Sequence, residues 1–297
     1  MSSDVAWDDQ RIFLAVLEEG SLSAAARRLG LSHPTVRSRI EALERELGTV
    51  LFTRSVNGLQ PTETAEALRG PARTMALASD LFVRQASSAA GAVAGTVRIS
   101  VPDFMGIEVL PRMLALLRAE HPAIRVEMVL SNASADLLAQ EVDIAVRTVA
   151  PRQQALVARK VAAIPLGLFA SPAYVAANGV PSSLAELAGH AVIGPDRNRA
   201  DLDFAAGLGM GFQREALVLR TDSHPAQLAA ARAGVGIAVV QVPVGQADPA
   251  LVRILPDIDL VVMETWIVTH ENLARIPRVR AAFDFLVECF QSASRRD

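Results

Sequence analysis

The sequence is poor in cysteine and in lysine. Cys289 is the one cysteine among 297 residues, which excludes an intrachain disulfide and any metal site built from several cysteines. It lies in the apolar run FDFLVECF, which favours a buried small residue over a reactive thiol. Of 29 basic residues only Lys160 is a lysine, and because Val161 follows it, no Gly-Lys-Ser/Thr phosphate loop exists.

Long apolar runs are also missing. No uncharged apolar stretch approaches the roughly 20 residues that a membrane span requires. The first ten residues, MSSDVAWDDQ, are acidic and lack the apolar segment of a signal peptide. These absences predict a cytoplasmic protein that does not contact a membrane. The net charge of -3 gives no global signature of polyanion binding, so a nucleic-acid surface must be local.

The patterns of common enzymes are absent as well. There is no Gly-x-Ser-x-Gly elbow, and the five histidines include no pair at metal-ligand spacing. No predicted strand precedes GLGMG at 207–211, as a dinucleotide site requires. The run Thr-Asp-Ser-His at 221–224 suggests a catalytic triad, but adjacent residues rarely converge and helix capping explains it better. We therefore expect neither an enzyme nor a metal or cofactor.

The first third of the chain, by contrast, carries a dense helical pattern. Apolar residues between Ile12 and Leu17 recur at helical spacing and predict a first helix. Ser21 can cap a second helix, and Gly30 supplies a residue free to take positive φ at the corner that follows. Ser32 is the expected N-cap of a third helix, with Pro34 in its first turn. An ordinary helical hairpin has the same spacing, so this pattern alone leaves that alternative open.

The third helix is predicted to have an apolar face and a polar face. Val36, Ile40, Leu43 and Leu47 fall on one side, and Ser38 lies opposite them. A helix-turn-helix places such a polar face in the major groove of DNA, N-terminus first. There an arginine can bind guanine through two hydrogen bonds. The residues that we expect at the DNA from these helices are Ser23, Ser32, His33, Pro34, Thr35, Arg37, Ser38 and Arg39.

A hairpin is predicted directly after this helix. Asn57-Gly58 is a typical turn sequence and lies between two short runs. A two-stranded wing at this point would bring Arg54 to the phosphate backbone, where it adds affinity without sequence information.

The segment from Thr62 to about Ala89 keeps a helical pattern with a heptad seam of alternating small and large residues. We expect it to form a homodimer contact, with a helix docked on its own domain as the alternative. Pro71 is expected to bend the helix near its start. The predicted dimerisation residues are Leu68, Ala72, Met75 and Phe82.

The remaining two-thirds alternate short β-type runs with helical ones, which predicts a mainly parallel sheet covered on both faces. The runs form two halves, and the strands that cross between them imply a cleft where ligands bind beyond strand ends. Helices at 109–119 and at 181–189 are among the predicted elements.

The stretch FLAVLEEGSLSAAARRLGLSHPTVRSRIEALERELGTVLFTRSVNGLQPT resembles the DNA-binding domain of LysR-type transcriptional regulators. The matching features are the GSLSAAA helix, the Ser-x-Pro entry, the Ile-x-x-Leu-Glu-x-x-Leu-Gly run, and Leu-Phe-x-Arg before a glycine wing. Arg37 and Ser38 stand where the family often has serine followed by arginine, and His33 stands where it often has glutamine. Downstream, VLPRML, HPAIRVEMVL, DIAVR, ASPAYVAANGVP and AARAGVGIAVV are similar, in order, to the family's co-inducer-binding domain.

The resemblance implies an α/β protein with three parts: a winged helix-turn-helix domain, a long linker helix and a two-lobed effector domain shaped like a periplasmic binding protein. The implied partners are double-stranded operator DNA, a small-molecule effector, a second copy of the chain and RNA polymerase. In related regulators the linker helix dimerises, and we expect a homodimer that pairs into a tetramer. A change in the angle between the lobes would then alter the spacing of the DNA-binding domains.

The expected boundaries follow from these patterns. Residues 1–61 form the winged domain, 62–90 the linker helix and 91–95 a hinge. Residues 96–297 form the effector domain, with lobe I at about 96–163 and 268–297 and lobe II at about 164–267. A solute-binding protein would also explain the two lobes, but the first 90 residues oppose it. A cleft enzyme lacks a convergent nucleophile, base or metal set.

The effector is expected at loops that follow strands. Helix starts near Ser131 and Ser223 can hold an anion through backbone amides. Arg147 ends its strand nearby, with a structural role as the alternative. Two aspartates in the set argue against a strongly acidic ligand, although each can instead cap a helix. The complete predicted set is Pro102, Asp103, Phe104, Ser131, Asn132, Arg147, Thr148, Phe204, Thr221 and Asp222.

Overall fold

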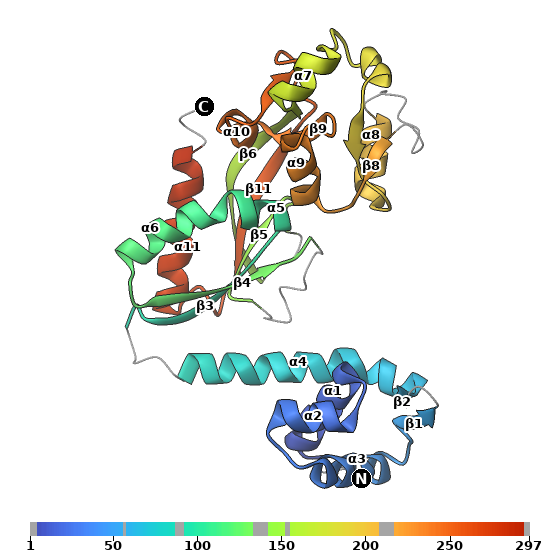
Figure 1. Cartoon of the computed structure of the whole chain (residues 1–297). Coiled ribbons are helices and arrows are strands. Elements are labelled where there is room, and N and C mark those ends of the chain that lie inside the picture. Colours follow the sequence, from blue (N-terminus) through green and yellow to red (C-terminus); the bar gives the residue numbers. More distant parts are fainter. Residues whose placement is uncertain are drawn as a thin grey trace. The chain divides into compact units, whose positions relative to one another are not determined.

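The computed structural model describes residues 5–55, 58–86, 92–132, 142–151, 155–207 and 217–293. The described residues form two compact units, one ending at Ala86 and one from residue 92 onward (Figure 1). Within these ranges, no helix is both long enough and apolar enough to cross a membrane.

The first unit consists of four helices and a two-stranded hairpin. The helices are α1 (Trp7–Glu19), α2 (Leu22–Leu29), α3 (His33–Leu47) and α4 (Glu63–Ala86), and the strands are β1 (Phe52–Ser55) and β2 (Gly58–Pro61). β1 and β2 pair antiparallel, which confirms the predicted wing, although residues 56 and 57 lie outside the described part. The core of the unit contains Ile12, Phe13, Val16, Leu17, Ala25, Ala26, Val36, Ile40, Leu43 and Leu51.

The helix ends form as the sequence predicts. The Ser21 hydroxyl accepts a hydrogen bond from the Ala24 amide at 3.1 Å, and Ser32 accepts one from Thr35 at 3.2 Å. Each serine satisfies an amide that has no partner inside its helix. Gly30 has φ +66°, a left-handed conformation that a residue with a side chain rarely adopts. The corner between α2 and α3 is therefore fixed by local chemistry.

One expectation for α3 is wrong. Leu47 was expected on the buried face, but 39% of it is exposed. Leu47 lies in the last turn of α3, directly before the C-cap Gly48, and the core covers only the earlier residues Val36, Ile40 and Leu43.

The second unit contains a seven-stranded sheet of mixed direction. Its order is β10-β6-β11-β5-β3-β4, and β9 also pairs with β6. β3 is parallel to β4 and β5, whereas the long strands β6 and β11 are antiparallel to each other and to their other neighbours. The strands are β3 (Gly95–Val101), β4 (Ile124–Leu130), β5 (Ile144–Arg147), β6 (Leu156–Ala170), β9 (Ala238–Gln241), β10 (Val252–Ile254) and β11 (Val261–His270).

The expectation of a mainly parallel sheet is therefore wrong. β6 has 15 residues and β11 has 10, and they pair from Val261↔Leu166 to His270↔Leu156. Alternation of strands and helices along the chain did not reveal that these two strands run in opposite directions through the middle of the sheet. A separate small parallel sheet joins β7 (Val192–Gly194) and β8 (Leu217–Arg220).

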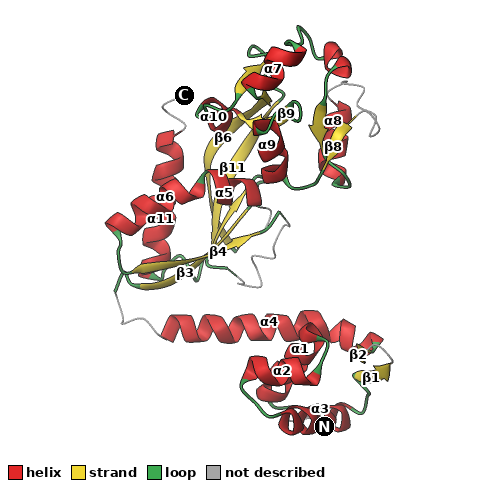
Figure 2. Ribbon diagram, in the orientation of Figure 1, coloured by secondary structure: helices red, strands yellow, loops and turns green. Residues whose placement is uncertain are grey.

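Figure 2 shows α6 and α11 beside the lower part of the large sheet and α7 to α10 near its upper end. α11 packs against α6 and against β3, β6 and β11. The helix predicted at 109–119 is α6, displaced by one residue, and Val109 separates it from the short helix α5, which the sequence did not predict. The helix predicted at 181–189 is a 3-10 turn over Ala185–Gly189. The helices are α5 (Asp103–Glu108), α6 (Leu110–Glu120), α7 (Pro172–Asn178), α8 (Arg199–Gly207), α9 (His224–Arg232), α10 (Val242–Gln246) and α11 (Pro277–Ala293).

Gly95 does not belong to a hinge. It is the first residue of β3, pairs with Ile124, and has φ +112°. A Cβ atom at this position would lie 3.3 Å from Cδ of Arg278, a buried arginine whose Nε donates to the Thr96 carbonyl at 3.0 Å. Residues 87–91, which include the start of the predicted hinge, lie outside the described part of the chain.

Candidate nucleic-acid interface and effector residues

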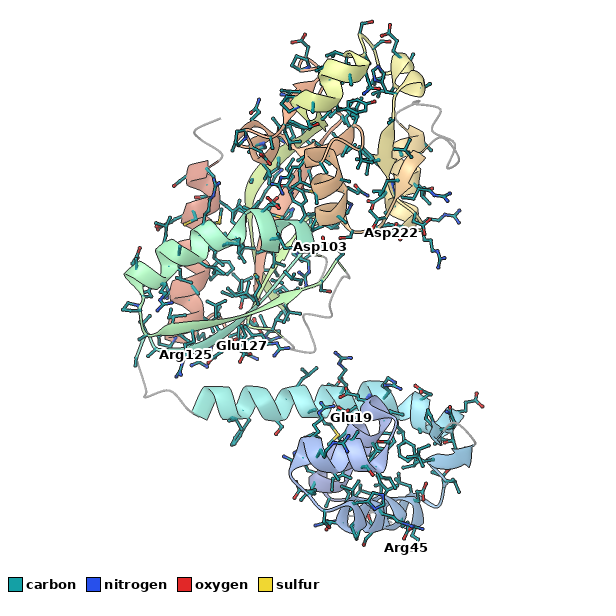
Figure 3. All side chains as sticks on the ribbon, in the orientation of Figure 1. Glu19, Arg45, Asp103, Arg125, Glu127 and Asp222 are labelled. Carbon is teal, nitrogen blue, oxygen red and sulfur yellow. The ribbon has the colours of Figure 1, made fainter. Side chains whose placement is uncertain are left out.

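The N-terminal half of α3 presents an exposed polar surface. His33, Pro34, Thr35, Arg37 and Ser38 are all exposed, whereas Val36 between them is fully buried. Figure 3 shows Arg45 farther along the same helix, on the side away from α4. The structure thus brings together most of the residues that the sequence predicts at DNA. Ser23 of α2 is exposed as well.

Hydroxyl groups organise the first turn of this surface. The Ser32 and Thr35 hydroxyls lie 2.7 Å apart, in addition to the bond from the Thr35 amide to Ser32. Both residues are exposed. Their hydroxyls therefore hold the start of α3 in place and remain within reach of an approaching acceptor.

The charged residues of α3 have two kinds of partner. Arg37 Nε lies 2.9 Å from Glu41 one turn along the same helix, and both side chains are half-exposed. Such an exposed pair stabilises a helix by only about 0.3–0.5 kcal/mol. Arg39 instead lies 2.9 Å from Asp9 of α1, whose side chain is 7% exposed. Arg37 is thus held only by an exposed pair within its own helix, whereas Arg39 positions α3 against α1.

Glu44, the glutamate of the Ile-x-x-Leu-Glu-x-x-Leu-Gly run, has a structural role that the sequence patterns did not indicate. Its Oε1 accepts hydrogen bonds from the amides of Leu51 at 2.7 Å and Phe52 at 3.1 Å. These bonds fix the start of the wing to α3. Arg54 of β1 pairs with Leu59 in the hairpin, and its side chain lies outside the described part.

α4 carries the four predicted dimerisation residues, and the structure divides them. Ala72 is buried in the core of the first unit and Leu68 packs against it. Met75 and Phe82 are 41% and 73% exposed. The first half of α4 therefore covers its own domain, and an apolar surface begins in the second half.

The predicted effector residues of the second unit are largely engaged within it. The Asp103 amide donates to the Asn132 side chain at 3.1 Å, which ties the start of α5 to the end of β4. Phe104 is only 7% exposed and packs in a core cluster, so it is unavailable as an open apolar contact. The Ser131 amide donates to the Val101 carbonyl at 2.9 Å. Pro102, Thr148 and Phe204 are half-buried.

Arg147 is held by neutral partners. Its Nη2 donates to the Ser100 hydroxyl at 2.9 Å, and its Nη1 donates to the carbonyls of Val146 at 2.7 Å and Ser100 at 3.3 Å. Desolvation by burial lowers the pKa of Arg147 from its ordinary value. These hydrogen-bond partners, all in the described part of the chain, are a hydroxyl and two carbonyl groups without charge. Arg147 is thus a half-buried cation at the end of β5.

Asp222 anchors a loop of the second unit. Its Oδ1 accepts the amides of Asp196, Arg197 and Asn198 at 2.8, 2.9 and 3.0 Å. These bonds, that from Asn198 foremost, lower the pKa of the Asp222 carboxyl. The Thr221 hydroxyl accepts the Ser223 amide at 3.2 Å, and Ser223 caps α9, as predicted for the Thr-Asp-Ser-His run. Both predicted effector residues here therefore have structural partners.

His224 is a polar centre that sequence analysis assigned to capping alone. Its Nε2 lies 3.1 Å from Asp201 of α8, and its Nδ1 lies 4.0 Å from Asp103 of α5. The hydrogen bond with Asp201 raises the pKa of His224 and outweighs the opposing effect of burial. No local pattern indicates this contact, because α8 was not a predicted element.

A cavity of about 1240 Å³ lies among α6, α10, α11 and the middle of β6. The residues lining it include Val109, Met113, Ile164, Val242 and Phe290. The ten predicted effector residues are not among those lining residues. The second unit therefore contains a hollow at a place that the sequence did not indicate.

Comparison with known proteins settles the family. Residues 7–66 match the model of bacterial regulatory helix-turn-helix proteins of the lysR family, and residues 90–291 match the LysR substrate binding domain. The chain belongs to the LysR family. Both parts are those of regulators and not of enzymes, in agreement with the sequence analysis.

Several curated relatives are named as HTH-type transcriptional regulators of bacteria. An HTH-type transcriptional regulator of Xanthomonas campestris is 33% identical over 65% of this chain and 56% of its own length. The regulator PtxR of Pseudomonas aeruginosa is 34% identical over 58% of this chain and 54% of its own length. The chain thus spans about half the length of these relatives.

Solved structures of the family share the fold along nearly the whole chain. CbnR, solved in complex with its target DNA, has a TM-score of 0.70 and 22% identity, covering 97% of this chain and 99% of its own. Full-length AphB of Vibrio cholerae has a TM-score of 0.62 and 22% identity, covering 95% and 99%. At this identity the likeness establishes the LysR fold, with its helix-turn-helix and its two-lobed effector domain.

Proposed function

We propose that this LysR-family protein is a sequence-specific DNA-binding regulator of transcription, controlled by a small molecule bound between the lobes of its second unit. The observation that carries the proposal is the exposed polar start of α3, presented behind the glycine corner at Gly30. The major groove of B-DNA, about 12 Å wide, admits such a helix. The apolar face of α3 packs against the core, so only the polar face is free to enter it.

The proposed contacts divide into base and phosphate contacts. Arg37 is proposed to bind guanine through two hydrogen bonds. Its present partner, Glu41, is half-exposed, so DNA can replace it. Ser38, Thr35 and His33 reach base edges or phosphates from the same turn. Ser23, Ser32, Pro34, Arg39 and Arg54 complete the proposed surface and position the helix through the backbone.

Assembly and location follow the same function. The exposed Met75 and Phe82 support a second copy of the chain as the partner of α4, in a homodimer that pairs into a tetramer. We assign RNA polymerase as a further partner and the cytoplasm as the compartment, where operator DNA and polymerase are found. The proposed domains are 1–61, 62–90 and 95–297, the last beginning with β3, and residues 91–94 connect the second to the third.

For the effector we propose a site beside the ends of β3, β4 and β5. Arg147 supports it because a half-buried guanidinium bound to neutral partners keeps its positive charge available to an acceptor group. Asn132, Thr148 and Phe204 add polar and apolar contacts. Closure of the lobes on this molecule would change the spacing of paired DNA-binding domains.

The test is to sequence the genomic fragments that the purified full-length protein retains at about 150 mM salt, where nonspecific binding is already weak. We expect a recurrent, roughly palindromic site upstream of particular genes. The matched control is Arg73→Ala, which removes an exposed arginine of α4 outside the proposed surface and should retain the same site. Retention of random fragments by the wild-type protein, with and without cell extract as a source of effector, would contradict the proposal.

A further inference from the structure

Two helices of the second unit, α5 and α9, pack against each other. α5 follows β3 and α9 follows β8 (Figure 1). With lobe I at about 96–163 and 268–297 and lobe II at about 164–267, as the sequence predicts, their contact crosses between the lobes. Apolar side chains fill its middle: Phe104 of α5 shares a buried cluster with Leu228 and Ala231 of α9. The two helices run in the same direction. Asp103 and His224 lie close together at their starts, and Glu108 and Arg232 pair at their ends.

The ends of the two helices meet in an ion-pair network. Arg232 Nη1 and Nη2 donate to the two carboxylate oxygens of Glu108 at 3.1 and 2.8 Å. Arg232 Nε donates to Asp248, which follows α10, at 2.6 Å. The side chains of Glu108 and Asp248 are 17% and 13% exposed, so water screens this network less than an exposed pair. Because a guanidinium stays charged at every physiological pH, the ionic link that Arg232 makes does not depend on protonation of the arginine.

The starts of the helices meet at a group that titrates. Three carboxylates face His224: Asp201 of α8, Asp103 of α5 and Asp222 just before α9. Asp201 is within hydrogen-bond distance of Nε2, whereas Asp103 lies 4.0 Å from Nδ1 and interacts through charge. A protonated imidazole therefore attracts Asp103 of lobe I as well as Asp201 of lobe II, which holds the lobes together. A neutral imidazole keeps only its hydrogen bond to Asp201, within lobe II.

We propose that α5 and α9 form a latch between the two lobes, in which Arg232 supplies a permanent ionic link and His224 a proton-dependent one. The inference rests on the proposed function in one respect, since it takes the angle between the lobes as the regulated quantity. It adds protonation of His224 as a second input beside the effector.

The direction of the pH effect follows from the raised pKa of His224. The attraction between protonated His224 and its carboxylates stabilises the latch fully when the pH is below the pKa of an unfolded-state histidine, about 6.5. This stabilisation is lost as the pH rises through the higher pKa of His224 in the folded protein. The latch is therefore tight in mildly acidic solution and loose in alkaline solution. The Arg232 link does not change over this range.

Spin labels on the full-length chain measure the separation of the lobes directly. Ala119 of α6 and Ala177 of α7 are exposed and lie in different lobes, so each is replaced by cysteine in a Cys289→Ser background. The inter-label distance distribution is recorded at about pH 6 and about pH 9, on either side of the histidine titration. We expect a narrow distribution at the lower pH and a broader, longer one at the higher pH.

Variants assign this response to the latch. His224→Gln should give the broad distribution at both pH values, and Asp201→Asn should reduce the difference between them. Arg232→Met should broaden the distribution at both values while a pH difference remains. The control His121→Gln removes another histidine beside a carboxylate, Glu120, and should keep the wild-type response.

The proposal is overturned if the wild-type distributions at the two pH values coincide, or if His224→Gln keeps the full difference. Should Arg232→Met fail to fold, the His224 and Asp201 variants still decide the matter. Because the measurement needs neither DNA nor effector, its outcome is independent of the genomic-fragment test. If the operator is recovered but the inter-label distance does not respond to pH, the latch is wrong and the proposed function stands. If the distance responds to pH through His224, the latch is supported whatever DNA the protein retains.

Discussion

Charged residues on α3 and on α9 are held in opposite ways. Arg37 of α3 pairs with a half-exposed glutamate one turn away on its own helix. Arg232 of α9 pairs with Glu108 and Asp248, which are mostly buried and come from other parts of the second unit. An exposed pair contributes at most about 1 kcal/mol and is easily exchanged, whereas shielded pairs resist separation. Arg37 can therefore exchange its partner easily, whereas Arg232 cannot.

The same contrast exists within α3 itself. Arg37 and Arg39 are two residues apart, yet only Arg39 contacts another helix, through the buried Asp9. Glu44 similarly ties α3 to the wing. The helix therefore has fixed residues that set its position and exchangeable residues that face outward.

The largest effect is expected from the buried face of α3. Leu43→Ala should lower the free energy of unfolding of the first unit by about 2–5 kcal/mol, because it leaves a cavity in the core. Leu47→Ala should cost less than about 1 kcal/mol, since Leu47 is already exposed to solvent. Urea unfolding followed by circular dichroism measures both. If Leu47→Ala lowered the free energy of unfolding as much as Leu43→Ala, Leu47 would be packed against the core and not exposed.

A smaller effect is expected from the exchangeable arginine. Arg37→Ala should weaken binding to the recovered operator by about 1–3 kcal/mol, because one bidentate base contact is lost. Titration by fluorescence anisotropy measures the change, and Arg73→Ala serves as the matched control. Protein stability should stay the same in both variants. If Arg73→Ala lost as much operator affinity as Arg37→Ala, the loss would result from the change in overall charge and not from a base contact.

The wing should contribute affinity without selectivity. Arg54→Ala should weaken binding to every duplex by a similar factor and reduce the slope of log K against log salt concentration by about 1. Titrations at several salt concentrations, on operator and on unrelated DNA, measure this slope. An unchanged affinity and slope would show that the wing does not contact phosphate.

The smallest effect is expected from the partner of Arg37. Glu41→Gln removes the carboxylate and should lower helix stability by about 0.3–0.5 kcal/mol. It should also strengthen DNA binding, since Arg37 no longer has to leave a partner and a negative charge facing the DNA is gone. Weaker operator binding by this variant would indicate that Glu41 itself reads a base.

Local signals in the sequence predicted the first unit well. The serine caps, the glycine corner and the apolar spacing act within a few residues of one another, so the helix-turn-helix and its exposed face could be derived from them. The partners of Arg39 and Glu44 were missed because a contact between separate elements leaves no periodic signal. Leu47 was misplaced because periodicity does not show where a core ends.

In the second unit, long-range pairing limited what could be predicted. The order of strands and helices was largely recovered, but the antiparallel course of β6 and β11 depends on contacts about 100 residues apart in the chain, such as Val261 with Leu166. The same limit applies to His224, whose carboxylate partners come from α5 and α8. Phe104 was expected in an open site because nothing local to it shows that α9 covers it.

The most direct test of the central claim compares base preferences of matched variants. Wild-type protein, Arg37→Ala and Arg73→Ala each select duplexes from one randomised library, and the selected pools are sequenced. We expect one motif for wild type and Arg73→Ala, and for Arg37→Ala the same motif with preference lost at a single guanine position in each half-site. An identical motif for all three proteins, or no motif for wild type, would contradict the assignment of α3 as the helix that reads DNA.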